Sequence, residues 1–208
     1  MKKLSIIAVI FLSALGVRAQ SQGDIGLNLY GGYTFDDEIH SDFSSIEIKG
    51  AFQYGLGAEF FVRPTKSIEL KYLRMDTKTP LFTPALGPGQ DNIGNDSSAI
   101  NYVLIGGNNY FPTGNPKLLP FLGLDLGVGW ASGDNNSSAR FAWDFKAGVK
   151  IKASETVAVK LQAYFQTIWA TYGSDTYYYP GWGYVSYPSD ASIYQFGLGA
   201  ALAFDFKR

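Results

Sequence analysis

Cysteine is absent from this chain of 208 residues, and histidine occurs once, at position 40. The absence of cysteine excludes a disulfide framework, a thiolate metal site, a cysteine nucleophile and a lipoprotein anchor on an N-terminal cysteine. Charged residues are scarce, at 17% of the chain, and the formal net charge is −1. A surface without a basic excess gives no reason to expect a nucleic-acid partner. The composition points to no metal site and no cofactor.

Long apolar runs are confined to the first twenty residues. Lys2 and Lys3 precede a mostly apolar run over 4–17, which is too short for a spanning helix, and a small-residue site follows at Val17-Arg18-Ala19. This order predicts a signal peptide over 1–19, with cleavage before Gln20. The remaining domain, 20–208, contains no continuous run of about eighteen apolar residues. We therefore expect a periplasmic protein, a secreted protein or an outer-membrane barrel.

Glycine and aromatic residues are abundant, with 24 glycines and 16% aromatics. They occur in segments where apolar and polar residues alternate, which is the period of a β-strand with two different faces. A helical interpretation fails because each interior glycine costs a helix about 1 kcal/mol. Eight such segments can be identified, at 25–35, 52–62, 68–72, 100–111, 122–130, 141–151, 157–169 and 193–206. In segment 100–111 both faces mix apolar residues with asparagine, so its register stays open.

The two faces of these segments distinguish a membrane barrel from a soluble one. One face is large and apolar, whereas the other is small, polar and rich in glycine, which suits a narrow lumen surrounded by lipid. Aromatic residues near segment ends are typical of interfacial girdles; they are Tyr33, Tyr54, Trp130, Trp143, Trp169 and Phe206. The pattern predicts an all-β fold, an eight-stranded antiparallel up-and-down transmembrane β-barrel.

The connections between segments alternate in length. Long ones are expected over 36–50, 76–98, 131–140 and 170–192, and short ones at 63–66, 112–116 and 153–155. Outer-membrane barrels have short periplasmic turns and long external loops. We therefore expect both termini in the periplasm and four loops outside the cell.

With these features the chain resembles the family of small eight-stranded outer-membrane barrels that includes the OmpA barrel domain, OmpX and OmpW. The resemblance covers the whole mature chain and rests on the signal peptide, the alternating segments, the loop asymmetry and the aromatic last strand, 196–206. That strand is similar to the family's assembly signal, although Lys207 and Arg208 follow Phe206 here. The resemblance implies a bacterial outer-membrane location and the barrel assembly machinery as a partner.

The polar face carries charges of both signs. Because eight strands leave an interior just filled by side chains, we expect a paired polar core rather than an ion path. The expected lumen network consists of Glu59, Glu69, Lys71, Asp125, Asp144, Lys146, Lys150, Lys160 and Asp205.

Two features of the expected external loops invite functional interpretation. The fourth loop carries an aromatic set that either binds a ligand or lies on extended strand ends at the membrane interface; it consists of Tyr172, Tyr177, Tyr178, Tyr179, Trp182, Tyr184 and Tyr187. His40 lies near Ser41, Asp42 and Ser44 in the first loop, where a lipid A-modifying enzyme would need a general base. Nothing in the sequence fixes that geometry, so a solvated loop histidine is favoured and no catalytic residue is assigned.

Three functional hypotheses follow from these features. The first is a non-enzymatic barrel that supports envelope integrity and presents loops to lipopolysaccharide or another extracellular ligand. The second is a narrow transporter for small or hydrophobic solutes. The third is a lipid A-modifying enzyme that uses His40.

Overall fold

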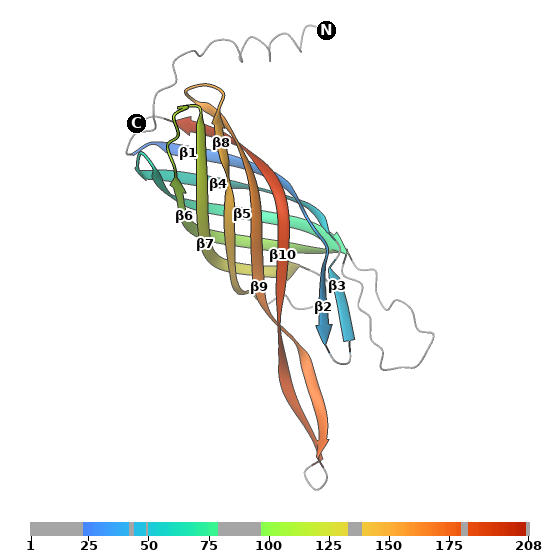
Figure 1. Ribbon diagram of the computed structural model, residues 1–208. Helices are drawn as coiled ribbons and strands as arrows, with labels where there is room; N and C mark the ends of the chain where they lie inside the picture. The colour runs from blue at the N-terminus through green and yellow to red at the C-terminus, as the bar shows by residue number, and fades with distance from the viewer. Residues whose placement is uncertain are drawn as a thin grey trace, which may run out of the picture.

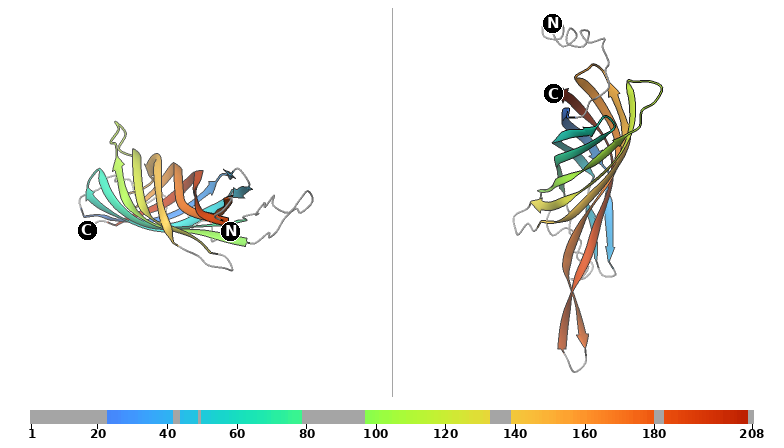
Figure 2. Two further views of the ribbon diagram at one scale, coloured as in Figure 1. Left: turned by 90° about the horizontal axis from the view of Figure 1, so that it is seen from below. Right: turned by 90° about the vertical axis from the view of Figure 1, so that its left-hand side faces the viewer.

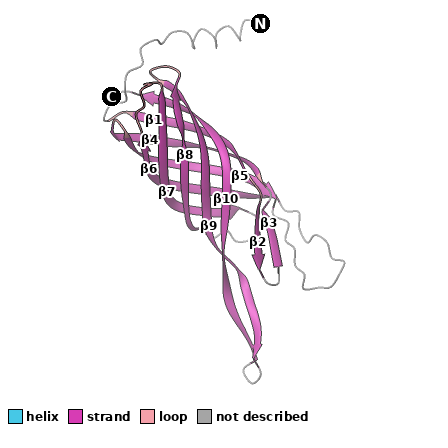
Figure 3. Ribbon diagram, in the orientation of Figure 1, coloured by secondary structure: helices cyan, strands magenta, loops and turns pink. Residues whose placement is uncertain are grey.

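The computed structural model describes residues 23–41, 44–48, 50–78, 97–132, 139–179 and 183–206. The predicted signal peptide and most of the expected loops at 76–98 and 131–140 lie outside these residues. Among the described residues no helix is long and apolar enough to cross a membrane. Strands account for nearly all of the described chain (Figure 3).

Eight antiparallel strands close into one barrel, in which each strand pairs with its sequence neighbours and the last pairs with the first (Figure 1). The closing pair runs in register from Ile25 opposite Phe206 to Thr34 opposite Gly197. Closure leaves no unpaired edge within the barrel wall, which a lipid environment requires. The barrel strands are β1 (Ile25–Thr34), β4 (Ala51–Arg63), β5 (Lys66–Lys78), β6 (Ser97–Tyr110), β7 (Leu118–Ser132), β8 (Arg140–Lys152), β9 (Val157–Tyr179) and β10 (Gly183–Phe206).

The predicted inside and outside faces are those of the structure. In β1, Leu27 and Leu29 are about half exposed on the outer face, whereas Asn28 is buried on the inner face. Inward glycines allow neighbouring strands to approach closely, because a Cβ on Gly127 would meet the carbonyl oxygen of Val103. The expectation of an eight-stranded all-β barrel is confirmed.

Two of the expected long connections contain regular structure instead. The connection over 36–50 holds a separate antiparallel hairpin, formed by β2 (Asp37–Ser41) and β3 (Ser44–Ile48). The connection over 170–192 is largely strand, because β9 and β10 continue past the barrel and pair only with each other from about Trp169 onward. We call this two-stranded extension, 169–179 with 183–192, the ribbon.

The ribbon and the β2–β3 hairpin project from the same end of the barrel (Figures 1 and 2). The short turns and the chain ends that enter and leave the barrel lie at the opposite end. We refer to these as the ribbon end and the turn end.

The structure also resolves the register that the sequence leaves open in β6. Tyr102 and Leu104 are fully buried on the inner face, and Val103 and Ile105 are exposed on the outer face. The pattern is ambiguous because this part of the lumen is itself apolar, so both faces of the strand carry apolar side chains.

Aromatic rings form a band on the outer face near the ribbon end. Phe35 stacks on Phe196 with ring centroids 5.9 Å apart, and Phe165 lies between Trp143 and Tyr194 at 5.6 and 6.0 Å. Such a band is typical of the interface between lipid and water in outer-membrane barrels. Phe206 lies at the turn end, where the opposite interface is expected.

The exposed apolar belt predicts how the purified chain behaves. Apolar side chains on every barrel strand form a contiguous surface far larger than a water-soluble monomer exposes. We expect the mature chain to need detergent, and to migrate differently in gel electrophoresis before and after boiling because the closed barrel resists unfolding. A monomer that stays soluble in plain buffer with a β-type circular dichroism spectrum would contradict the membrane-barrel assignment.

Candidate functional site

All nine residues of the expected lumen network are buried inside the barrel, each with at most 5% of its surface exposed. They come from six strands and occupy the middle and the turn end of the lumen. A buried charge costs several kcal/mol unless it is paired and hydrogen-bonded, so the arrangement of their partners decides whether the barrel is stable.

Like charges face each other across three neighbouring strand pairs. Glu59 lies opposite Glu69 between β4 and β5, and Asp125 lies opposite Asp144 between β7 and β8. Lys150 lies opposite Lys160 between β8 and β9. Directly opposed like charges destabilise a sheet. These pairs therefore need compensating charges from elsewhere in the barrel.

The compensation comes from strands on other parts of the wall. Lys71 on β5 lies 2.7 Å from Asp125 and 2.9 Å from Asp144, so it bridges that acidic pair. Lys146 on β8 lies 2.7 Å from Glu69 and 2.8 Å from Asp125. Most of these bridges join strands that are not hydrogen-bonded to each other, so they form only when the sheet curls into a closed barrel.

Glu59 lies at the centre of a second group that includes several neutral donors. Lys160 donates a hydrogen bond of 2.6 Å to Glu59, and Tyr110 donates another of 2.6 Å. Asn108 donates to Glu59 at 2.9 Å and to Glu69 at 3.1 Å, so it links the two groups. The remaining neutral donors to these two glutamates are Asn28, Tyr30 and Ser67.

These neutral donors are not among the residues singled out from the sequence. They lie on the inner face of β1, β5 and β6, the same face that carries the charged residues. Once the register of each strand is known, the alternation of side chains therefore identifies them.

Aromatic side chains are buried in the lumen at the turn end. They are the side chains of Phe61, Tyr110 and Phe121. The Tyr110 ring centroid lies 5.8 Å from that of Phe61 and 5.6 Å from that of Phe121. The Lys150 ammonium lies 5.1 Å from the Phe61 ring centroid and 2.9 Å from Asp205. Cation–π contact of this kind stabilises an ammonium that has left water.

Amide and apolar side chains are buried in the lumen towards the ribbon end. Gln53 donates to Gln166 at 3.2 Å, Gln166 donates to Gln195 at 3.0 Å, and Tyr102 donates to Gln195 at 2.7 Å. A buried apolar cluster packs in this region and consists of Tyr30, Leu73, Met75, Ile100, Tyr102, Leu104, Ala142, Ile168 and Ala201. Buried neutral side chains therefore lie on both sides of the charged middle.

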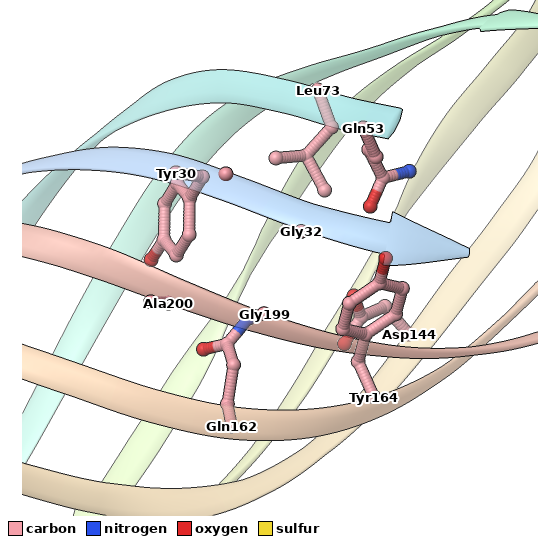
Figure 4. A pocket seen from close by; sticks show the side chains of 10 residues that line it. Tyr30, Gly32, Gln53, Leu73, Asp144, Gln162, Tyr164, Gly199 and Ala200 are labelled. Carbon is pink, nitrogen blue, oxygen red and sulfur yellow. The ribbon is translucent and has the colours of Figure 1, made fainter. Parts of the chain in front are cut away.

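A small cavity lies beside the network, lined by residues of β1, β10, β9 and β8 among others (Figure 4). Its volume is about 10 Å³, and its lining includes Asp144, Gln162, Tyr164 and Gly199. Asp144 Oδ1 and Gln162 Oε1 have no hydrogen-bond partner in the described part of the chain. The cavity has space for about one water molecule.

The structure places the external candidate residues on strands. His40 lies in β2 opposite Ser45, and Ser41 lies opposite Ser44; Asp42 is outside the described residues. Trp182 is also outside the described residues. The six tyrosines of the aromatic set lie in the ribbon, with Tyr172, Tyr177, Tyr178 and Tyr179 in β9 and Tyr184 and Tyr187 in β10. Their backbone is therefore extended strand rather than irregular loop, and the external aromatic surface itself stays a prediction.

The closed topology and the inward polar face can be compared with known proteins. No protein-family model and no curated protein sequence matches this chain. Among solved structures, OprG from Pseudomonas aeruginosa superposes with a TM-score of 0.63 at 11% identity, over 93% of this chain and 100% of that chain. The fold is that of the small outer-membrane barrels.

Two further structures support the same likeness. Neisserial surface protein A superposes with a TM-score of 0.60 at 13% identity, over 90% of this chain and 99% of that chain. The N-terminal barrel domain of Pseudomonas aeruginosa OprF superposes with a TM-score of 0.51 at 14% identity, over 89% of this chain and 100% of that chain. At these identities the likeness concerns the fold, so function has to be argued from the residues of this chain.

The lumen network has the character of a structural core. Each of its lysines lies within 3 Å of a carboxylate oxygen, and each carboxylate lies within 3 Å of a lysine. Within the described ranges no group of three His, Cys, Asp or Glu side chains is arranged to hold a metal ion. The charged members of the network are therefore paired with one another.

Proposed function

We propose that this protein is a non-enzymatic barrel of the bacterial outer membrane with a closed lumen, and that its external hairpins contact surface ligands and support envelope integrity. The observation that supports the proposal is the burial and pairing of the inward charges. Paired charges occupy the middle of the interior, and buried neutral side chains lie on both sides of them. An interior of this kind stabilises the wall and leaves the outer surface and the projecting strands for interactions.

The orientation follows from the lengths of the connections and from the chain ends. The three short turns lie at the turn end, where β1 begins and β10 ends. Short turns face the periplasm in barrels of this type. A signal peptide over 1–19 and insertion by the barrel assembly machinery agree with this orientation. The ribbon and the β2–β3 hairpin then project outside the cell, towards lipopolysaccharide.

The ribbon is the most distinctive external feature. Tyr178 lies opposite Tyr184, and Tyr187 lies opposite Asp175, so tyrosines occur on both strands near its tip. Tyrosine is enriched at binding surfaces because it buries a large area at little cost in side-chain entropy. A paired backbone presents these residues in a fixed order, which favours recognition of an extracellular ligand over solvation alone.

The closed lumen can be tested by electrical recording. We expect the purified mature protein to give little or no steady conductance in planar bilayers, because the paired lysines and carboxylates leave no continuous water-filled path. An ion-selective pore would instead carry a ring of one sign. Large, reproducible single-channel steps in the parent protein would contradict the proposal and favour the transporter hypothesis.

A further inference from the structure

A depression of about 520 Å³ lies in the outer wall of the barrel near the turn end. Leu122, Leu124 and Phe145 line it with apolar surface, and each of these side chains is 44–52% exposed. It is hollow above β6 because Gly107 faces outward there and carries no side chain. We call it the wall groove.

Polar groups lie at the edge of the wall groove that is nearer the turns. Lys66, the first residue of β5, lines it and lies opposite Asn109 of β6. Arg63 is opposite Lys66 across the turn between β4 and β5. Both cations are exposed, and neither has an ion-pair partner in the described part of the chain.

The groove therefore combines two chemistries in order along β6, with the cation at the turn end and the apolar floor beyond it. Gly107 lies two residues beyond Asn109 on β6, which places the apolar floor roughly 7 Å deeper along the strand than the polar edge. A phospholipid has the matching order, with an anionic phosphate at the surface and acyl chains beneath it. Cationic side chains near a membrane surface attract such headgroups.

We propose that the wall groove holds one phospholipid of the periplasmic leaflet, with an acyl chain over Gly107 and the phosphate beside Lys66. The proposal rests on the proposed outer-membrane location and on the orientation with the turns in the periplasm. It adds a specific lipid site to a surface that would otherwise contact lipid without preference.

The variants follow from the geometry around Gly107. A Cβ at this position would meet only the Ser67 carbonyl oxygen, at 3.4 Å, which is ordinary van der Waals contact. Gly107→Leu should therefore fill the groove without disturbing the barrel. Lys66→Gln removes the cation. Ala163→Leu adds three of the four carbons that Gly107→Leu adds, at an outward position on β9 that does not line the groove.

The test counts lipids bound to the full mature protein by native mass spectrometry, after incubation in mild detergent with phosphatidylethanolamine, phosphatidylglycerol or diacylglycerol. We expect one retained phospholipid on the parent and on Ala163→Leu, and about tenfold weaker retention on Gly107→Leu because the acyl chain loses its apolar contacts. Lys66→Gln should weaken binding of both phospholipids and leave diacylglycerol unchanged.

Several outcomes would overturn the site. The first is a folded parent that retains no phospholipid, or one that retains a lipid with the mass of lipopolysaccharide. The second is phospholipid retention that is unchanged on Gly107→Leu, or reduced as much on Ala163→Leu as on Gly107→Leu. The third is a loss of diacylglycerol on Lys66→Gln that equals the loss of phospholipid. Heat-modifiable migration of every variant is measured in parallel. A parent that fails that assay contradicts the membrane barrel itself, whereas a parent that passes it without a bound lipid contradicts only the groove.

Discussion

Leu124→Arg is expected to destabilise the folded barrel by about 2–4 kcal/mol, the cost of a cationic side chain on the lipid face near the bilayer midplane. Leu124 lies near the middle of β7 and is 52% exposed on the outer face, between neighbouring strands that also present apolar residues. The measurement is the free energy of unfolding in phospholipid vesicles by denaturant titration.

Two matched variants define what that result means. Leu124→Met keeps an apolar side chain at the same place and should remain close to the parent. Val159→Arg introduces the same charge on the outer face only two residues from the start of β9, where the cost should fall to about 0–1 kcal/mol because the headgroups are near. If Leu124→Arg unfolds at the same denaturant concentration as the parent, the assignment of inside and outside faces is wrong.

The assignment of faces is the part of the fold that the sequence predicts best. In β8, Phe141 and Phe145 face outward while Asp144 and Lys146 are buried, as the alternation indicates. The pattern is informative there because lipid selects apolar residues on one face and the charged middle of the lumen selects polar residues on the other. Where the lumen is apolar, as around Tyr102 and Leu104, the contrast between the faces disappears and the register cannot be read.

The strands beyond the barrel illustrate the same limit. In the ribbon, the backbone of β9 and β10 stays paired as far as Tyr179 and Gly183, although the sequence over 170–192 does not alternate. Alternation reports a difference between two environments, and a ribbon outside the wall has no lumen on one side. Backbone pairing can therefore continue where the sequence signal ends, and the segment is mistaken for a loop.

The pairing within the lumen network is also beyond sequence reasoning. The alternation along each single strand predicts that Glu69, Lys71 and Lys146 point inward. Their partners, however, lie on strands that are far apart in the chain. Lys146 and Glu69 are 77 residues apart and meet only because β5 and β8 face each other across the closed barrel. A list of inward charges thus predicts that pairing is needed without predicting which pairs form.

Lys146→Ala tests that pairing directly. Lys146 is the common partner of Glu69, at 2.7 Å, and of Asp125, at 2.8 Å, and it is 1% exposed. Removing one member of a buried ion pair costs about 3–5 kcal/mol, because a charge remains buried without compensation. We expect this loss in the free energy of unfolding, measured in phospholipid vesicles, with no new conductance in a barrel that still folds.

The controls separate a buried network from a simple change in charge. Arg74→Ala removes the same charge from an exposed pair with Asp76, and should change stability little because solvent already screens that pair. Asp125→Asn in the Lys146→Ala background removes a carboxylate that would otherwise keep only Lys71, so it should recover part of the lost stability. Equal stability of Lys146→Ala and Arg74→Ala would show that water reaches the network. Steady single-channel currents from Lys146→Ala would show that its ammonium had blocked a path, and the lumen would then be a gated channel rather than a closed core.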